Sequence, residues 1–183
     1  MELIPKYLDQ SAIRIVTGGG PETSKILELK FNQILYTGSG KIGRIVATAA
    51  AKHLTPCVLE LGGQAPAIVT KSADVSLAAK RIANTKFMNA GQICLAVNHV
   101  FVDPAIHDEF VEKVKEWFAV FFQEGKTEQF CTVVNERNFD RLTGLLERTK
   151  GDVVRGGESD RSALFFDPVV VTGVDIQGLV SQC

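Results

Sequence analysis

Apolar and polar positions along the chain follow two periods, one typical of strands and one typical of helices. Apolar runs of strand length, bounded by glycine, proline or polar turns, occupy residues 13–17, 31–37, 57–61, 67–69, 97–102, 151–157 and 168–171. Helical spacing or composition predicts helices over residues 4–8, 21–29, 41–54, 75–89, 104–122 and 135–150. Strands that alternate with helices along a chain indicate an α/β fold.

Several of these elements have recognisable ends. Asp74 is a suitable N-cap for the helix that follows it, and Pro104 suits the first turn of a helix. Gly62-Gly63 is the clearest break between two different series of strands and helices. We therefore expect two domains, residues 1–61 and residues 62–183.

The composition excludes several classes of protein. The 183 residues include 20 Lys+Arg and 21 Asp+Glu, a net charge of −1, so the basic face of a nucleic-acid-binding protein is not expected. With 45% hydrophobic and 22% charged residues, the chain is too apolar for intrinsic disorder. No apolar run approaches the roughly 20 residues of a membrane span, and the N-terminal segment does not resemble a signal peptide. We expect a cytoplasmic location and no membrane anchor in this chain.

The cysteines and histidines do not form a metal-site pattern. The four cysteines contain no C-x-x-C pair and are expected to be free thiols; they are Cys57, Cys94, Cys131 and Cys183. We expect Cys57 in the core and Cys183 in an exposed tail. The histidines also lack the spacing of metal ligands, so no metal is expected; they are His53, His99 and His107.

A glycine-rich turn follows the predicted strand at 31–37. Gly38-Ser39-Gly40-Lys41-Ile42-Gly43 fits the pattern G-x-G-x-x-G and lies between a strand and a helix. Glycines permit a tight turn, and the N–H groups that begin the helix can meet a pyrophosphate. A strand–helix turn without a ligand is the alternative. If the turn binds a dinucleotide, Glu60 could be the acid that holds its ribose.

Two further side chains are candidates for catalysis. Glu60 ends a predicted strand beside flexible glycines, where burial would suit it to act as a general base. The alternative is an ordinary exposed carboxylate. Cys94 follows a loop at residues 89–92, where a partly exposed thiol could act as a nucleophile. The alternative is a small core residue.

Together these segments are more specific than each one alone. Thr37-Gly38-Ser39, Leu59-Glu60-Leu61-Gly62-Gly63 and Phe87-Met88-Asn89-Ala90-Gly91-Gln92-Ile93-Cys94 resemble the aldehyde dehydrogenase superfamily. Residues 2–8 and 49–56 most resemble its class 3, fatty-aldehyde branch. The resemblance extends to about Asp175. It implies a central fragment of the aldehyde dehydrogenase fold, with part of a Rossmann-like NAD(P)-binding domain over residues 1–61 and part of the α/β catalytic domain over 62–183.

The resemblance also implies a role for each matched residue. Cys94 matches the nucleophile that attacks an aldehyde carbonyl to form a thiohemiacetal, which becomes a thioester after hydride transfer to NAD or NADP. Its backbone N–H would be one arm of the oxyanion hole. Glu60 matches the general base that activates water. This role replaces the ribose-binding role that the glycine-rich turn alone suggested for Glu60. Because the family's motif is G-S-x-x-x-G, Gly40 is not part of it and is incidental to cofactor binding. The cofactor positions implied are Thr37, Gly38, Ser39, Gly43 and Leu61.

The resemblance covers only the middle of the family's pattern. The family's oxyanion-hole asparagine and ribose-binding lysine would precede Met1, its Glu-Glu-Ile-Phe-Gly-Pro motif would follow Asp175, and Gln64 replaces a usual lysine. We therefore expect a chain truncated at both ends with impaired activity, because hydride transfer needs a positioned nicotinamide. The expected substrate is an aldehyde, with long-chain aliphatic aldehydes among the candidates. The alternatives are a catalytically inactive homologue that associates with itself or a full-length relative, a residual Cys-dependent esterase, and an incomplete gene prediction without a function.

Overall fold

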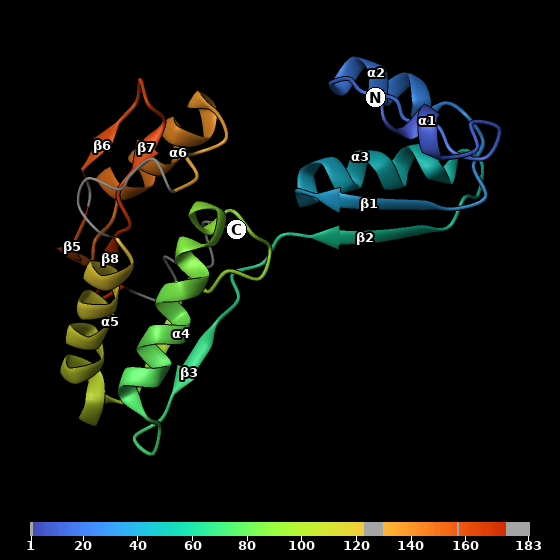
Figure 1. The fold of residues 1–183 in the computed structure, drawn as a ribbon. Helices are drawn as coiled ribbons and strands as arrows, with labels where there is room; N and C mark the ends of the chain where they lie inside the picture. Colours follow the sequence, from blue (N-terminus) through green and yellow to red (C-terminus); the bar gives the residue numbers. More distant parts are fainter. Residues whose placement is uncertain (1, 123–129, 157, 175–183) are drawn as a thin grey trace. The chain divides into compact units, whose positions relative to one another are not determined.

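The computed structural model describes residues 2–122, 130–156 and 158–174 (Figure 1). The chain divides into two compact units between Leu61 and Gly62. In each unit a parallel pair of strands is accompanied by helices, as the sequence predicts for an α/β fold. The predicted tail position of Cys183 lies outside the described residues.

The first unit contains a parallel pair of strands that one helix connects. Its elements are α1 (Ile4–Tyr7), α2 (Gly20–Leu27), β1 (Ile34–Gly38), α3 (Gly40–Ala51) and β2 (Cys57–Leu61). β1 and β2 pair in parallel, with Ile34 opposite Cys57 and Gly38 opposite Leu61. The alanine-rich sequence of α3 favours a helix, and its Val46 and Ala50 are buried.

The second unit begins with another parallel pair and two long helices. Its first elements are β3 (Ala67–Val69), α4 (Val75–Phe87), the 3-10 turn η1 (Met88–Gly91), β4 (Val100–Val102), the 3-10 turn η2 (Pro104–Ile106) and α5 (His107–Phe121). β3 pairs in parallel with β4. Asp74 caps α4 as predicted, since its Oδ1 accepts the N–H of Leu77 at 2.9 Å. The apolar faces of these elements form one core, made of Val69, Val75, Ala79, Ala83, Phe110, Val114 and Phe118.

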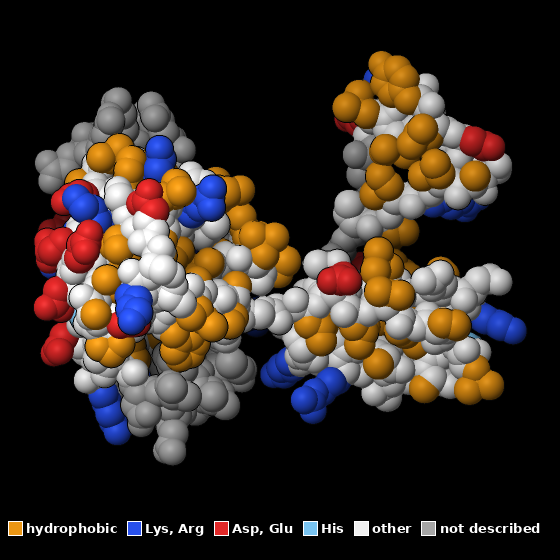
Figure 2. Space-filling model, turned by 90° about the horizontal axis from the view of Figure 1, so that it is seen from below, with side chains coloured by type: hydrophobic (Ala, Val, Ile, Leu, Met, Phe, Trp, Pro, Cys, Tyr) orange, Lys and Arg blue, Asp and Glu red, His pale blue; other side chains and the backbone are white. Residues whose placement is uncertain are grey.

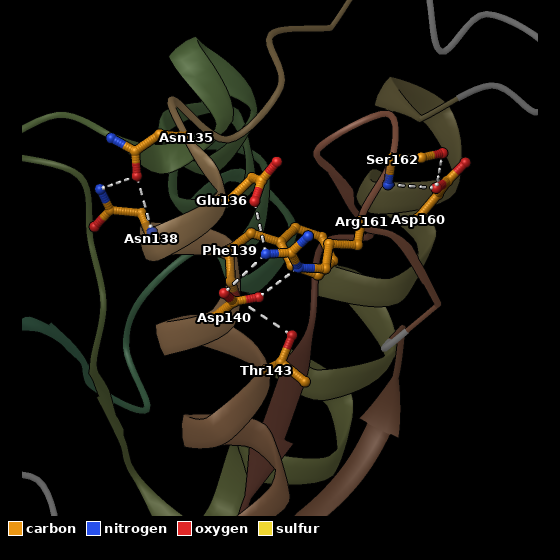
Figure 3. Close-up of polar contacts among 9 residues, drawn as sticks. All are labelled: Asn135, Glu136, Asn138, Phe139, Asp140, Thr143, Asp160, Arg161 and Ser162. Atoms are coloured by element: carbon orange, nitrogen blue, oxygen red, sulfur yellow. Dashed lines mark hydrogen bonds and ion pairs between the residues drawn. The ribbon is translucent and has the colours of Figure 1, made fainter.

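The rest of the second unit is a helix and two antiparallel strand pairs. The helix is α6 (Glu136–Glu147); β5 (Asp152–Arg155) pairs with β8 (Val170–Thr172), and β6 (Ser159–Asp160) pairs with β7 (Phe165–Phe166). Arg161, between β6 and β7, ties this hairpin to α6 (Figure 3). Its guanidinium donates to Asp140 at 2.8 and 3.1 Å and to Glu136 at 2.8 Å.

The structure departs from the sequence prediction at a few elements. The strand predicted over residues 13–17 is wrong, because these residues are exposed and irregular. A strand needs a neighbour for its N–H and C=O groups, and within the described part of the chain no strand pairs with residues 13–17. The predicted strand at 97–102 begins only at Val100. The described helices include none that is long and apolar enough to cross a membrane.

Apolar side chains reach the surface of both units (Figure 2). Leu35 of β1 is 68% exposed and Ile68 of β3 is 77% exposed. Both alternate with residues that face the helices of their own unit. Parallel strands in proteins are usually covered on both faces, so each pair has one apolar face that its own unit leaves open.

Candidate active site

The turn after β1 is shaped by its glycines and a serine cap. A Cβ at Gly38 would collide with the hydroxyl of Tyr36, so only glycine fits between that ring and the turn. Ser39 caps α3, since its Oγ accepts the N–H of Ile42 at 3.4 Å. Gly40 faces open space, as expected for a glycine that is incidental to the turn. The ring of Tyr36 therefore lies against the turn at Gly38 and Ser39, while Gly40 adds no side chain at the start of α3.

Gly43 and Leu61 fix the distance between α3 and β2. Gly43 is buried, and a Cβ there would lie 2.9 Å from Cδ2 of Leu61. The parallel register places Thr37 opposite Glu60 and Gly38 opposite Leu61. The structure thus brings all five predicted cofactor positions and Glu60 to the carboxyl ends of two neighbouring strands. Ligands of open α/β sheets bind at such an edge.

Glu60 is exposed in the structure of its own unit. The sequence left two readings open, a buried general base and an ordinary exposed carboxylate. Leu59 points toward the half-buried side of β2, and Glu60, the next residue, points to the opposite and open side. Within this unit the side chain of Glu60 therefore matches the exposed alternative, and its role as a general base stays a prediction.

Cys94 lies on an irregular loop between α4 and β4. Its thiol is free and exposed, as the nucleophile prediction requires. The loop begins with three residues in the left-handed region, since φ is 51° at Asn89, 54° at Ala90 and 71° at Gly91. The second unit also contains Gly63, where a Cβ would lie 3.4 Å from the carbonyl oxygen of Cys94. Gly63 therefore lies close to the backbone of Cys94.

Two polar side chains that the sequence analysis missed hold this loop. Gln92 bonds to the backbone of Asn89, Thr132 and Val134. Lys86 donates to Asn98, which lies just before β4. Lys86 and its partner are 12 residues apart, and Gln92 is 40 and 42 residues from Thr132 and Val134. The spacing of residues along the sequence therefore does not predict these contacts.

Lys86 also shapes the electrostatics beside the loop. Burial lowers the pKa of Lys86 below its ordinary value. Burial, and then the nearby Lys86, lower the pKa of His99.

In the described residues no three His, Cys, Asp or Glu side chains gather as a metal site. Cys57 is half-buried rather than fully in the core, and Cys131 is exposed. Glu60 belongs to the first unit and Cys94 to the second.

Comparison with known proteins agrees with these motifs. A profile of the aldehyde dehydrogenase family matches residues 1–182. The chain belongs to this family. The "Aldehyde dehydrogenase, dimeric NADP-preferring" of Rattus norvegicus is 43% identical to it over 182 residues, covering 98% of this chain and 40% of the relative. The "Aldehyde dehydrogenase family 3 member A2" of Mus musculus is 40% identical over 183 residues, covering 99% of this chain and 37% of the relative.

These relatives confirm the resemblance to class 3 aldehyde dehydrogenases. This aldehyde dehydrogenase chain spans about two fifths of the length of the curated relatives it matches. The substrate-bound AldH of Staphylococcus aureus has a TM-score of 0.89 and 31% identity over 95% of this chain and 38% of that one. Betaine aldehyde dehydrogenase of Staphylococcus aureus, in complex with NAD+, has a TM-score of 0.70 and is 26% identical, covering 79% of this chain and 31% of that one. The described residues therefore have part of the aldehyde dehydrogenase fold.

Proposed function

We propose that this chain acts in the oxidation of an aldehyde to a carboxylic acid, with Cys94 as the nucleophile. The observation that carries the proposal is the exposed Cys94 thiol on a loop that is fixed by side-chain hydrogen bonds. Attack of the thiolate on the carbonyl carbon forms a C–S bond and moves an electron pair to the carbonyl oxygen. The backbone N–H of Cys94 would stabilise that oxygen.

Glu60 would serve the second half of the reaction. Its carboxylate takes a proton from the water that attacks the thioester carbon. The C–S bond then breaks, the electron pair returns to the sulfur of Cys94, and the carboxylic acid leaves. Gly63 packs against Cys94, and only Leu61 and Gly62 separate Gly63 from Glu60 along the chain. The pairing of Glu60 with Cys94 rests on the match of both motifs to the aldehyde dehydrogenase family.

The turn after β1 would hold the cofactor. Thr37, Gly38 and Ser39 would meet the pyrophosphate of NAD or NADP, while Gly43 and Leu61 keep α3 close to β2. The first N–H groups of α3 can donate to a phosphate at the start of the helix. When bound, the cofactor supplies the oxidation by accepting a hydride. The turn suits either cofactor, since both share the pyrophosphate.

The direct test uses the purified 183-residue chain with hexanal and NAD+ or NADP+. We expect slow, aldehyde-dependent formation of NAD(P)H that Cys94→Ala abolishes. Cys131→Ala is the matched control, because it removes another exposed thiol of the same unit. Formation that continues in Cys94→Ala would refute the proposal. Turnover at the roughly 1–10³ s⁻¹ of ordinary enzymes would contradict the expected impairment.

The same variants separate the esterase alternative. Hydrolysis of p-nitrophenyl acetate needs no cofactor, so a Cys94-dependent esterase would act in its absence. If Cys94→Ala removes ester hydrolysis while aldehyde oxidation is undetectable in the unmodified chain, a residual esterase explains the site. A longer aldehyde such as decanal, compared with hexanal, measures whether long-chain aliphatic substrates are preferred.

A second candidate function is association with a full-length relative. The open apolar faces at Leu35 and Ile68 favour it, because parallel strands are usually covered on both sides. Such an association would be detected as co-elution of the two chains in size-exclusion chromatography. Replacement of Leu35 and Ile68 by threonine should weaken it, and independent elution at micromolar concentrations would oppose it.

A further inference from the structure

The side chain of Gln92 connects the Cys94 loop to a distant segment. Its Nε2 donates to the carbonyl oxygens of Asn89 and Thr132, at 3.0 Å each. Its Oε1 accepts the backbone N–H of Val134 at 2.9 Å. Both N–H groups and the oxygen of the carboxamide are therefore in use. Thr132 and Val134 are 40 and 42 residues further along the chain, so these contacts join two separate segments.

The segment that receives Gln92 is itself held in place. Val133 lies between the two partners and is only 4% exposed. Its backbone N–H donates to the carbonyl oxygen of Leu164 at 2.9 Å. Because Thr132 and Val134 flank a buried residue, their backbone groups form a fixed support for the carboxamide of Gln92.

The backbone before Cys94 needs such a support. Asn89 and Ala90 have φ values of 51° and 54°, which a Cβ disfavours. The carbonyl oxygen that Gln92 holds belongs to Asn89, inside this unfavourable stretch. That carbonyl also accepts the backbone N–H of Gln92 at 3.1 Å, and Nδ2 of Asn89 donates to the carbonyl oxygen of Gln92 at 3.2 Å. The side chain of Gln92 is the contact among these that reaches outside the loop, and its loss would let the turn relax toward the right-handed region. Relaxation there would turn the chain that leads to Cys94.

Cys94 has a second anchor on its other side. Ala96 is 2% exposed, and its N–H donates to the carbonyl oxygen of Ile93 at 3.0 Å. Cys94 thus lies between the contacts of Gln92 and the buried Ala96. We propose that Gln92 is a positioning residue, which fixes the direction of the Cys94 thiol and N–H by fastening the loop to Thr132 and Val134. This inference rests on the proposed role of Cys94 as nucleophile.

The test measures the reaction of Cys94 in the full chain. Iodoacetamide alkylation of each cysteine is followed by mass spectrometry while hexanal is added. The carbonyl carbon of hexanal bonds reversibly to the sulfur, its oxygen gains a proton, and alkylation is blocked. In Gln92→Ala we expect half-protection of Cys94 to need about tenfold more hexanal, the effect of about one lost hydrogen bond. Unchanged fluorescence of Trp117, which lies in α5 of the same unit as Gln92, shows that this unit remains folded.

Two other variants make the result specific. Thr132→Ala keeps the carbonyl that accepts from Gln92, so we expect half-protection as in the unmodified chain. Gln92→Glu keeps an acceptor for the Val134 N–H but loses both donors. We expect its half-protection to weaken as in Gln92→Ala, while hydrogen exchange at Val134 speeds up only in Gln92→Ala. Half-protection within about twofold of the unmodified chain in both Gln92 variants would overturn the inference.

Failure of the proposed function gives a different result. If hexanal does not protect Cys94 in the unmodified chain, the nucleophile role fails. The alkylation rate of Cys94 without aldehyde then decides whether Gln92 positions the thiol. A change of about threefold or more in Gln92→Ala, absent in Thr132→Ala, supports positioning. An equal rate in all three proteins overturns it.

Discussion

The ammonium of Lys86 donates a hydrogen bond to Oδ1 of Asn98 and thereby closes the base of the Cys94 loop. The Nδ2 of Asn98 then donates to Oε1 of Gln64 at 3.0 Å. An ammonium can only donate, so the asparagine must present its oxygen to Lys86 and its amide nitrogen to residue 64. Glutamine can accept that bond, whereas a lysine at this position could not. Gln64 is therefore matched to Asn98 in this chain.

Removal of the Asn98 side chain should destabilise the second unit. Asn98→Ala leaves the partly buried ammonium of Lys86 without this acceptor, which we expect to cost about 1–3 kcal/mol in the free energy of unfolding. Urea unfolding can be followed through Trp117, the one tryptophan of the sequence, which lies in α5. Asn84→Ala is the control, because Asn84 is an exposed asparagine of α4, and we expect a change within about 0.5 kcal/mol. Equal stability of the two variants would contradict this prediction.

His99 should respond to the charge of Lys86. Burial and the lysine hold the pKa of His99 below its ordinary value of 6.5. The unfolded chain then binds the proton more readily, so stability falls as the pH drops below 6.5 through the lower folded value. Lys86→Met should raise the pKa of His99 toward 6.5 and reduce this loss. An NMR titration of His99 measures the shift. The same shift in Lys80→Met, which removes a charge elsewhere on α4, would contradict the assignment to Lys86.

The sequence predicts a strand correctly where its apolar pattern is matched by a partner strand in the fold. β2 and β3 have the predicted bounds, because short apolar runs between glycine, proline or polar residues lie beside a partner strand. Residues 13–17 have the same apolar pattern without a partner among the described residues, and they form no strand. β6 and β7 are two residues long each, too short for any period to show.

The candidate site was predictable in its residues but not in its supports. The motifs identify Cys94, Glu60 and the turn at Gly38, because these segments combine residue types at fixed spacing. The left-handed conformation of Ala90 has no local signal, since alanine rarely adopts it. The side chain of Gln92 is one of the contacts that hold this turn, and its partners Thr132 and Val134 are placed by tertiary packing.

The two glycines of α3 should respond differently to alanine. A Cβ at Gly40 meets open space, so Gly40→Ala should stabilise the first unit by about 0.5–1 kcal/mol through lower backbone entropy of the unfolded chain. A Cβ at Gly43 would lie 2.9 Å from Cδ2 of Leu61 and must displace that side chain, so Gly43→Ala should give less stability than Gly40→Ala. Far-UV circular dichroism during urea unfolding measures both. Equal effects of the two substitutions would show that Gly43 is not needed for close packing of α3 on β2.

The contact between Arg161 and Asp140 should make stability depend on acid pH. The hydrogen bond from Arg161 lowers the pKa of Asp140 below its ordinary 3.8. Asp140 therefore contributes stability above pH 3.8 that is lost as the pH falls through its lower folded value. Both side chains are more than half exposed, so the contribution is small. Asp140→Asn should lower the thermal midpoint of Trp117 fluorescence slightly at neutral pH, and the difference should vanish near pH 2.

A carboxylate elsewhere on the same helix provides the control for Asp140. Glu147 is exposed at the C-terminal end of α6, away from the position of Asp140 along the helix. Glu147→Gln makes the same change of charge without removing a partner of Arg161, so its midpoint should follow the unmodified chain at every pH. A midpoint difference for Asp140→Asn that persists undiminished in acid would show that the asparagine disturbs packing rather than the ion pair.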